Sequence, residues 1–179
     1  MHRERRSSAG FSMLEVLVTI LVLSIALLGS AKMQTASLSN TQMARLQSLI
    51  AIQAGSLAAA MHGNPAYWSS GGAPSAFTVS GTTVSDAVLG AANPLDCTTV
   101  SCTPPQLATY DTQTWAFNMN QQFPSYAATV NCTTTAGIPV SCNITVSWSE
   151  KYIGINRTTS TAGGSTMTSQ QTYTLYVQP

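Results

Sequence analysis

The feature that most limits how this chain can fold is an apolar run near its amino terminus, from Phe11 to Ala31. About 21 residues at the helical rise of about 1.5 Å are enough to cross a hydrocarbon core of roughly 30 Å. Three arginines precede the run, at Arg3, Arg5 and Arg6, and the positive-inside rule places that end in the cytoplasm. The sequence therefore predicts one membrane-spanning helix, with the rest of the chain on the outer side.

Small residues come before the apolar run and not after it, at Ser8, Ala9 and Gly10. An ordinary secretory signal has its small-residue cleavage site after the apolar stretch. Cleavage among them would instead leave the apolar run on the mature protein.

A single carboxylate, Glu15, interrupts the apolar run near its start. A charge inside a membrane helix costs a few kcal/mol or more unless its depth or a partner relieves the cost. An intramembrane acid is therefore a functional hypothesis by default. The alternative is that Glu15 lies shallow enough to reach the lipid headgroups.

The segment Gly-Phe-Ser-Met-Leu-Glu-Val-Leu-Val-Thr-Ile, which begins at Gly10, resembles the class III leader of type IV pilins and type II secretion pseudopilins. In that family a membrane aspartyl peptidase cuts after the glycine and methylates the new amino terminus. The resemblance implies cleavage between Gly10 and Phe11, N-methylation of Phe11, and assembly or recruitment through Glu15. In the family, this carboxylate pairs with the amino terminus of a neighbouring subunit.

A helical pattern continues beyond the membrane segment, because apolar residues fall on one arc at about 100° per residue. They are Ala36, Met43, Leu46, Ile50, Ala54, Leu57 and Met61. Gly63 and Pro65 supply the residues expected at and after a helix end. The predicted organisation has four parts: a leader at 1–10, the transmembrane half of a long helix at 11–31, its amphipathic half at 32–62, and a globular head at 63–179.

The connection from Asn64 to Asn93 is rich in glycine and serine and is expected on the surface. It contains a short hairpin around Gly81. A second helix is predicted from about Pro104 to Gln121, because Thr103 and Gln106 form a capping-box pattern and prolines occupy its first turn. Its large side chains are expected to form core and packing surface: Leu107, Tyr110, Trp115, Phe117 and Met119.

Alternating apolar residues then predict three or more antiparallel strands. The alternating sets are Ala128, Val130 and Cys132; Val140, Cys142, Ile144, Val146 and Trp148; and Tyr173, Leu175 and Val177. The stretch from Thr158 to Gln171 reads as a flexible loop. The fold class expected from the pilin resemblance is α+β, with a long N-terminal helix packed on a small antiparallel sheet and an extra short helix.

Four cysteines lie in the second half of the chain, and an even number in an exported domain predicts two disulfides. Three connectivities are open in principle. The local pairs Cys97 with Cys102 and Cys132 with Cys142 are favoured because each closes a short loop. A zinc site is the alternative, but His2 and His62 lie elsewhere and neither pair has the C-x2-C spacing.

The charge composition argues against nucleic-acid binding, and the scatter of the ionisable residues along the chain argues against catalysis. Only 7% of the residues are charged, against roughly 25% in an ordinary soluble domain. Removing the leader leaves four basic and five acidic residues, a side-chain charge of 4 − 5 = −1, so a phosphate-binding surface is not expected. The scattered ionisable residues read as capping or solvated groups, and no catalytic, cofactor or metal site is predicted. They are His62, Asp86, Asp96, Asp111 and Glu150.

The second half, from Leu107 through Trp115 and Phe123 to the Val-Ser-Trp strand, resembles PilV-type minor pilins, also called type IV pilus modification proteins. This resemblance implies a low-abundance subunit that primes pilus assembly and sits at the tip. The implied partners are the prepilin peptidase, the inner membrane, the assembly platform, the major and other minor pilins, and a large tip adhesin. A minor pseudopilin of type II secretion and a DNA-uptake pilin remain alternatives at this stage.

Overall fold

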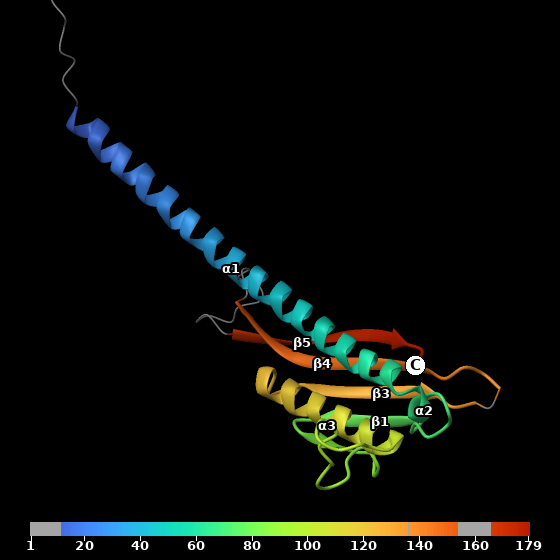
Figure 1. Cartoon of the computed structure of the whole chain (residues 1–179). Coiled ribbons are helices and arrows are strands. Elements are labelled where there is room, and N and C mark those ends of the chain that lie inside the picture. The colour runs from blue at the N-terminus through green and yellow to red at the C-terminus, as the bar shows by residue number, and fades with distance from the viewer. Residues whose placement is uncertain (1–11, 136, 154–165) are drawn as a thin grey trace, which may run out of the picture. The chain divides into compact units, whose positions relative to one another are not determined.

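The computed structural model describes residues 12–135, 137–153 and 166–179 of the chain. Its elements are helix α1 (Met13–Gly63), helix α2 (Pro65–Trp68), strands β1 (Ala76–Ser80) and β2 (Thr83–Val84), helix α3 (Pro104–Gln122), and strands β3 (Ala127–Thr133), β4 (Ser141–Ile153) and β5 (Thr166–Val177) (Figure 1). The chain divides into two compact units, Met1–Thr41 and Gln42–Pro179. The division falls within α1, inside the half predicted to be amphipathic.

Helix α1 is a continuous helix, as its lack of internal proline predicts. The arc predicted from helical periodicity is confirmed in the second unit, where Ile50, Ala54, Leu57 and Met61 are buried. Leu46 is partly buried and packs against the same core. The side chain of Ala36 lies outside the described residues. The second half of α1 is therefore part of the core of the head.

The sheet contains five strands in the order β2-β1-β3-β4-β5, and every neighbouring pair is antiparallel. Side chains alternate between a buried face and an exposed face, as the sequence alternation predicts for β3 and β4. On β5 the predicted set is less covered, because Tyr173 and Leu175 are only partly buried whereas Val177 is buried. The predicted fold class is confirmed: the chain has the α+β type IV pilin fold.

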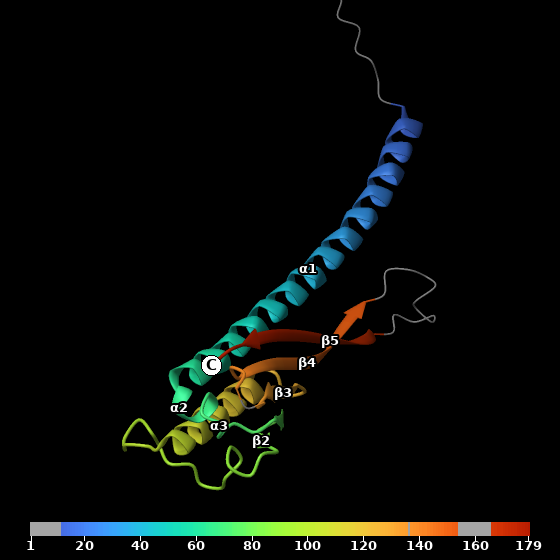
Figure 2. The same cartoon turned by 90° about the vertical axis from the view of Figure 1, so that its right-hand side faces the viewer.

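Figures 1 and 2 show α3 and the second half of α1 on the same face of the sheet. The two helices are joined by a hydrogen bond in which the indole Nε1 of Trp115 donates to the carbonyl oxygen of Gln53 at 2.8 Å. Core side chains from both helices and from the sheet form one buried cluster. The opposite face of the sheet carries no described helix.

Helix α3 begins and ends close to where the sequence predicts. The backbone N–H of Thr103 donates to Oε1 of Gln106 at 2.9 Å, which is one half of the expected capping box. Trp115 and Met119 are buried as predicted. The prediction was wrong for Phe117, which is 54% exposed. It lies two residues after Trp115, about 200° around the helix, and so points away from the sheet.

The connection between α1 and α3 is more ordered than its composition suggests. The predicted hairpin is confirmed, with Gly81 at φ +58° between β1 and β2. The prediction of a surface position was wrong for Tyr67 and Trp68, which lie in α2 and are buried. Their rings pack edge to face, with centroids 5.1 Å apart. Two large rings bury enough apolar area to hold this segment against the core despite the surrounding glycines and serines.

The loop predicted from Thr158 to Gln171 is only partly a loop. Residues 158–165 lie outside the described residues, but Thr166 to Gln171 form the first half of β5 and pair with Trp148 to Ile153 of β4. The prediction was wrong for these residues because it inferred a loop from their polar composition alone. Threonine favours extended backbone, and a long partner strand supplies the pairing.

Two disulfides are present, in the local connectivity that the sequence favours. Cys97 and Cys102 close a loop before α3, with their Cα atoms 5.6 Å apart. Cys132 and Cys142 are register partners on β3 and β4, with their Cα atoms 4.0 Å apart, and both are buried. The second disulfide therefore holds β3 and β4 in register next to the loop that joins them.

Replacing both Cys132 and Cys142 by alanine is expected to lower the free energy of unfolding of residues 42–179 by about 2–3 kcal/mol. The loss comes from the freer unfolded chain and from the two buried sulfur atoms. Urea unfolding followed by tryptophan fluorescence measures it. The matched control is the Cys97→Ala, Cys102→Ala pair, which closes a smaller and more exposed loop and should cost less. A larger loss in the control would contradict this ranking.

Candidate functional site in the N-terminal helix

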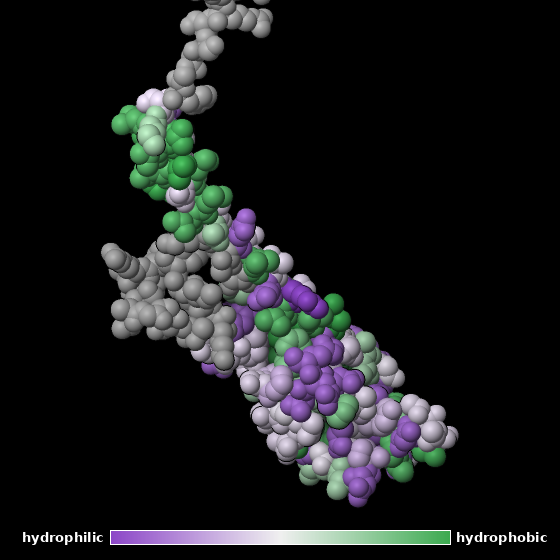
Figure 3. All heavy atoms as spheres, turned by 90° about the vertical axis from the view of Figure 1, so that its left-hand side faces the viewer, coloured by the Kyte–Doolittle hydropathy of each residue, from purple (hydrophilic) through white to green (hydrophobic). Residues whose placement is uncertain are grey.

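The segment Met13–Ala31 of α1 is long and apolar enough to cross a membrane. None of this segment is buried within the structure, and its large apolar side chains are exposed on all sides of the helix. On the face that Figure 3 shows, the N-terminal end of the described chain is mostly hydrophobic surface. A helix that is apolar all round is stable only in lipid or packed against other protein, so this surface requires an apolar environment, which the described residues do not provide.

The hydroxyl groups in this segment are satisfied within the helix itself. Thr19 donates to the carbonyl oxygen of Val16 at 2.9 Å, and Ser24 donates to that of Ile20 at 2.7 Å. Ser30 donates to the carbonyl oxygen of Leu27 at 2.9 Å. A hydroxyl bonded to the preceding turn costs little in an apolar medium, because no donor is left without an acceptor. These residues are therefore compatible with a membrane or with a dry interface between helices.

Glu15 is the only ionisable side chain between Met13 and Ala31. It lies in the first turn of α1, is exposed, and its backbone N–H donates to the carbonyl oxygen of Ser12 at 3.0 Å. The hydroxyl of Ser12 accepts from the N–H of Leu14 at 3.3 Å, so Ser12 caps the helix. A carboxylate in the first turn interacts favourably with the helix dipole.

The predicted cleavage and methylation sites, Gly10 and Phe11, lie immediately before the described residues, so their assignment remains a prediction. Residues 5–31 match the family model described as the prokaryotic N-terminal methylation motif. Neither a curated protein nor a solved structure matches the chain.

The methylation motif covers the leader and the apolar run but not the head. It supports a type IV pilin-like or pseudopilin precursor and implies processing by a prepilin peptidase and handling by a pilus assembly machinery. Together with the apolar helix, it fits a precursor anchored in the inner membrane.

In the head, two of the acidic residues, Asp86 and Asp96, accept hydrogen bonds from the backbone of the residues that follow them. Oδ1 of Asp86 accepts from the N–H groups of Val88 and Leu89, both at 2.9 Å, and Asp96 accepts from the N–H and hydroxyl of Thr98. Of the two roles expected for these residues, capping or solvated, both aspartates have the capping one, because each binds backbone N–H groups of the turn that follows it. His62 is exposed in the last turn of α1, and burial raises the pKa of the half-buried Asp111 above its ordinary value.

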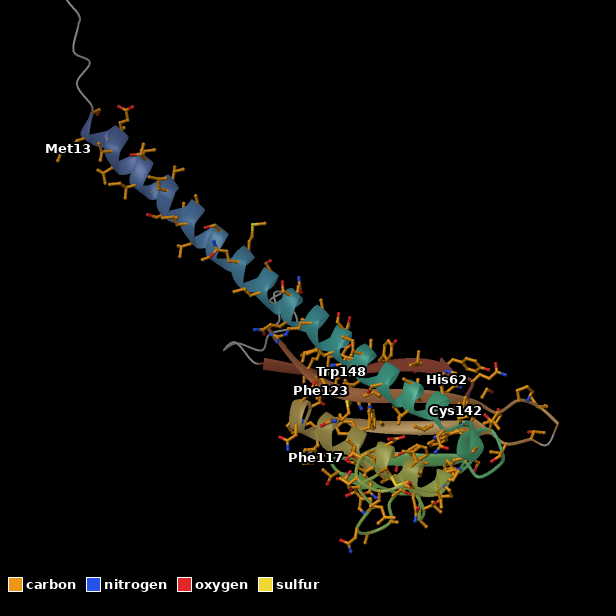
Figure 4. The ribbon with its side chains drawn as sticks, viewed as in Figure 1. Met13, His62, Phe117, Phe123, Cys142 and Trp148 are labelled. Carbon is orange, nitrogen blue, oxygen red and sulfur yellow. A yellow bond between two sulfur atoms is a disulfide. The ribbon has the colours of Figure 1, made fainter. Side chains whose placement is uncertain are left out.

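The prediction was wrong for Glu150, which is only 4% exposed and is not a solvated residue. The indole Nε1 of Trp148 donates to Oε1 of Glu150 at 2.8 Å, and both side chains are buried. Trp148, labelled in Figure 4, belongs to the buried core cluster of the head. The signal was present in the sequence, because Glu150 continues the buried alternation of Ile144, Val146 and Trp148 along β4.

Glu150→Ala is expected to lower the free energy of unfolding of residues 42–179 by about 1–3 kcal/mol, because the buried Trp148 indole loses its acceptor. Glu150→Gln is the matched control. It keeps an oxygen at the same place and should retain most of the stability. Urea unfolding of the three proteins tests the assignment, which would be contradicted if the alanine and glutamine variants were equally destabilised.

Proposed function

We propose that this chain is a minor pilin, a low-abundance structural subunit that primes type IV pilus assembly and sits at or near the filament tip. In this proposal it supports twitching motility and adhesion and has no enzymatic activity. Its immature form is held in the inner membrane with the head in the periplasm, and its assembled form lies in the pilus at the cell surface.

The proposal rests on the difference in burial between the two parts of the continuous helix α1. The first part of α1 is exposed and apolar on all sides, whereas the second part is built into the core of the head. Such a helix can leave lipid and pack among other apolar helices while its own head stays folded. The methylation motif at its start is the processing signal of proteins that assemble in this way.

Glu15 gives the proposal its chemistry. After cleavage, the Phe11 ammonium and the Glu15 carboxylate are opposite charges about one helical turn apart. In an apolar filament core, each charge is costly unless an opposite charge relieves it. Pairing of Glu15 with the amino terminus of a neighbouring subunit would satisfy both and set the axial register of the two helices. Glu15 therefore acts in recruitment more than in the stability of the head.

The proposed partners follow from this role. They are the prepilin peptidase, the inner-membrane assembly platform, the major and other minor pilins, and a large tip adhesin. Nucleic acid is not among them in this proposal, because a mature side-chain charge of −1 offers little attraction for phosphate.

A strain that lacks this chain tests the proposal against a pseudopilin role in type II secretion. We expect loss of twitching and of surface pili with normal release of secreted proteins, restored when the full chain is supplied again. Loss of protein secretion with intact pili would contradict the proposal and favour the pseudopilin. Loss of DNA uptake alone would favour a DNA-uptake pilin.

A further inference from the structure

The face of the sheet opposite α1 and α3 carries a regular array of small polar side chains. Strand register aligns β1, β3, β4 and β5 into cross-strand rows. One row consists of Ala76, Asn131, Asn143 and Tyr176, the next of Thr78, Thr129, Thr145 and Thr174, and the third of Ser80, Ala127, Ser147 and Thr172. All of these side chains are exposed or half-exposed. Neighbours lie about 4.8 Å apart across the strands, and rows about 6.8 Å apart along them.

The array offers hydrogen-bonding groups that the protein itself leaves largely unused. The hydroxyls of Thr145 and Thr174 lie 3.2 Å apart and bond to each other. The side chains of Asn131, Asn143 and Tyr176 form no hydrogen bond with other described residues. Each Asn amide has an NH₂ group that donates hydrogen bonds and an oxygen that accepts them, and each hydroxyl group can donate or accept. The face therefore presents donors and acceptors at short, regular intervals.

None of the three rows contains a charged residue, so the array itself offers no ion pair to an anionic or cationic polymer. It also lacks the features of a protein interface, whose centre is usually enriched in several aromatic residues, Met and Arg that fill pockets. The one large side chain is Tyr176, which is 63% exposed and stands opposite Asn143 in the register. Its ring combines an apolar face with a polar tip.

We propose that this face binds a neutral polysaccharide. The ring of Tyr176 would stack on the apolar side of a sugar ring, and Asn143, Asn131 and the threonine row would bond to its hydroxyl groups. A neutral polymer with several free hydroxyl groups on each sugar matches an uncharged array of hydroxyls and amides. The proposal goes beyond assembly into a filament, because binding by the head does not depend on the apolar helix.

The test uses the processed full chain in a detergent that carries no sugar headgroup, with dextran, mannan and xylan as neutral probes and alginate as an anionic one. We expect biolayer interferometry to show binding of at least one neutral probe, unchanged by added salt because no ion pair is involved. Tyr176→Ala should weaken that binding about tenfold or more, since the stacked ring is lost. Asn143→Ala should weaken it independently of the ring.

Phe117→Ala is the matched control, because Phe117 is an aromatic residue of similar exposure on α3, in the opposite layer. It should bind as the unchanged chain does. The proposal is overturned if no neutral probe binds, if alginate is preferred, or if Tyr176→Ala and Asn143→Ala both bind normally. It is also overturned if light scattering shows that the face pairs two copies of the chain and that Tyr176→Ala separates them. Pilus loss in the deletion strain bears on the proposed function alone.

Discussion

Gly10→Val is expected to leave the chain uncut, with its leader attached and no mature form detectable in membranes. The side chain of valine is branched next to the backbone, and it would meet the wall of a cleft that must admit the scissile peptide bond. The measurement is an immunoblot of membranes from peptidase-competent cells, in which the variant should migrate only as the precursor. Surface pili that contain the variant should then be missing.

Ser8→Val is the matched control for this result, because it adds the same side chain two residues before the glycine. It should be cut like the unchanged chain. Normal cutting of Gly10→Val would show that the glycine is not required at the cleavage site and would remove the processing step from the account.

Glu15→Val is expected to reduce incorporation of the chain into filaments on the order of 100-fold, since the amino terminus of a neighbouring subunit would stay unpaired in the apolar core. The head should remain folded, because Glu15 lies in the first compact unit and is not among the residues of the buried core cluster of the head. Quantitative immunoblotting of sheared pili against the membrane pool measures the ratio. Thermal unfolding of the purified variant checks the head.

Thr19→Val controls for the loss of a polar group from the same helix. The Thr19 hydroxyl bonds only to the carbonyl oxygen of Val16 in its own helix, so its removal should leave incorporation within about twofold, as expected for a change of a few tenths of a kcal/mol. If both variants were incorporated equally well, Glu15 would have no role in recruitment.

Most of the fold could be predicted from local sequence patterns. The long helix followed from its periodicity and from the missing proline, and Gly63 with Pro65 marked its end. The start of α3 followed from the caps at Thr103 and Gln106, whose pattern depends on neighbouring residues alone. The pairing of Cys132 with Cys142 agreed with the strands on either side of it. Each of these features is decided within a short stretch of chain.

The failures came where distant contacts decide the outcome. Composition suggested a loop at Thr166 to Gln171, but β4 extends far enough to pair with it. Tyr67 and Trp68 stand among glycines and serines, yet they are buried by residues far away in the sequence. Phe117 read as core because it is aromatic, although its angle around α3 turns it outward.

The candidate site divides in the same way. Glu15 and the apolar run are visible in the sequence because a charge among apolar residues is a local anomaly. The rows that end at Thr174 and Tyr176 exist only because four strands align in register, and no short window of sequence contains that information. Glu150 is an intermediate case. The alternation along β4 places it on the buried face, but this prediction requires knowing that the strand extends as far as residue 150.

The most direct test of the account is the mass of the intact mature chain from purified membranes and sheared filaments, together with sequencing of its first residues. We expect a chain that begins at Phe11, carries one added methyl group on its amino nitrogen, and retains the whole apolar helix. A mature product that begins after Ala31, with the apolar run discarded, would contradict the proposal that this helix holds the subunit first in the membrane and then in the filament.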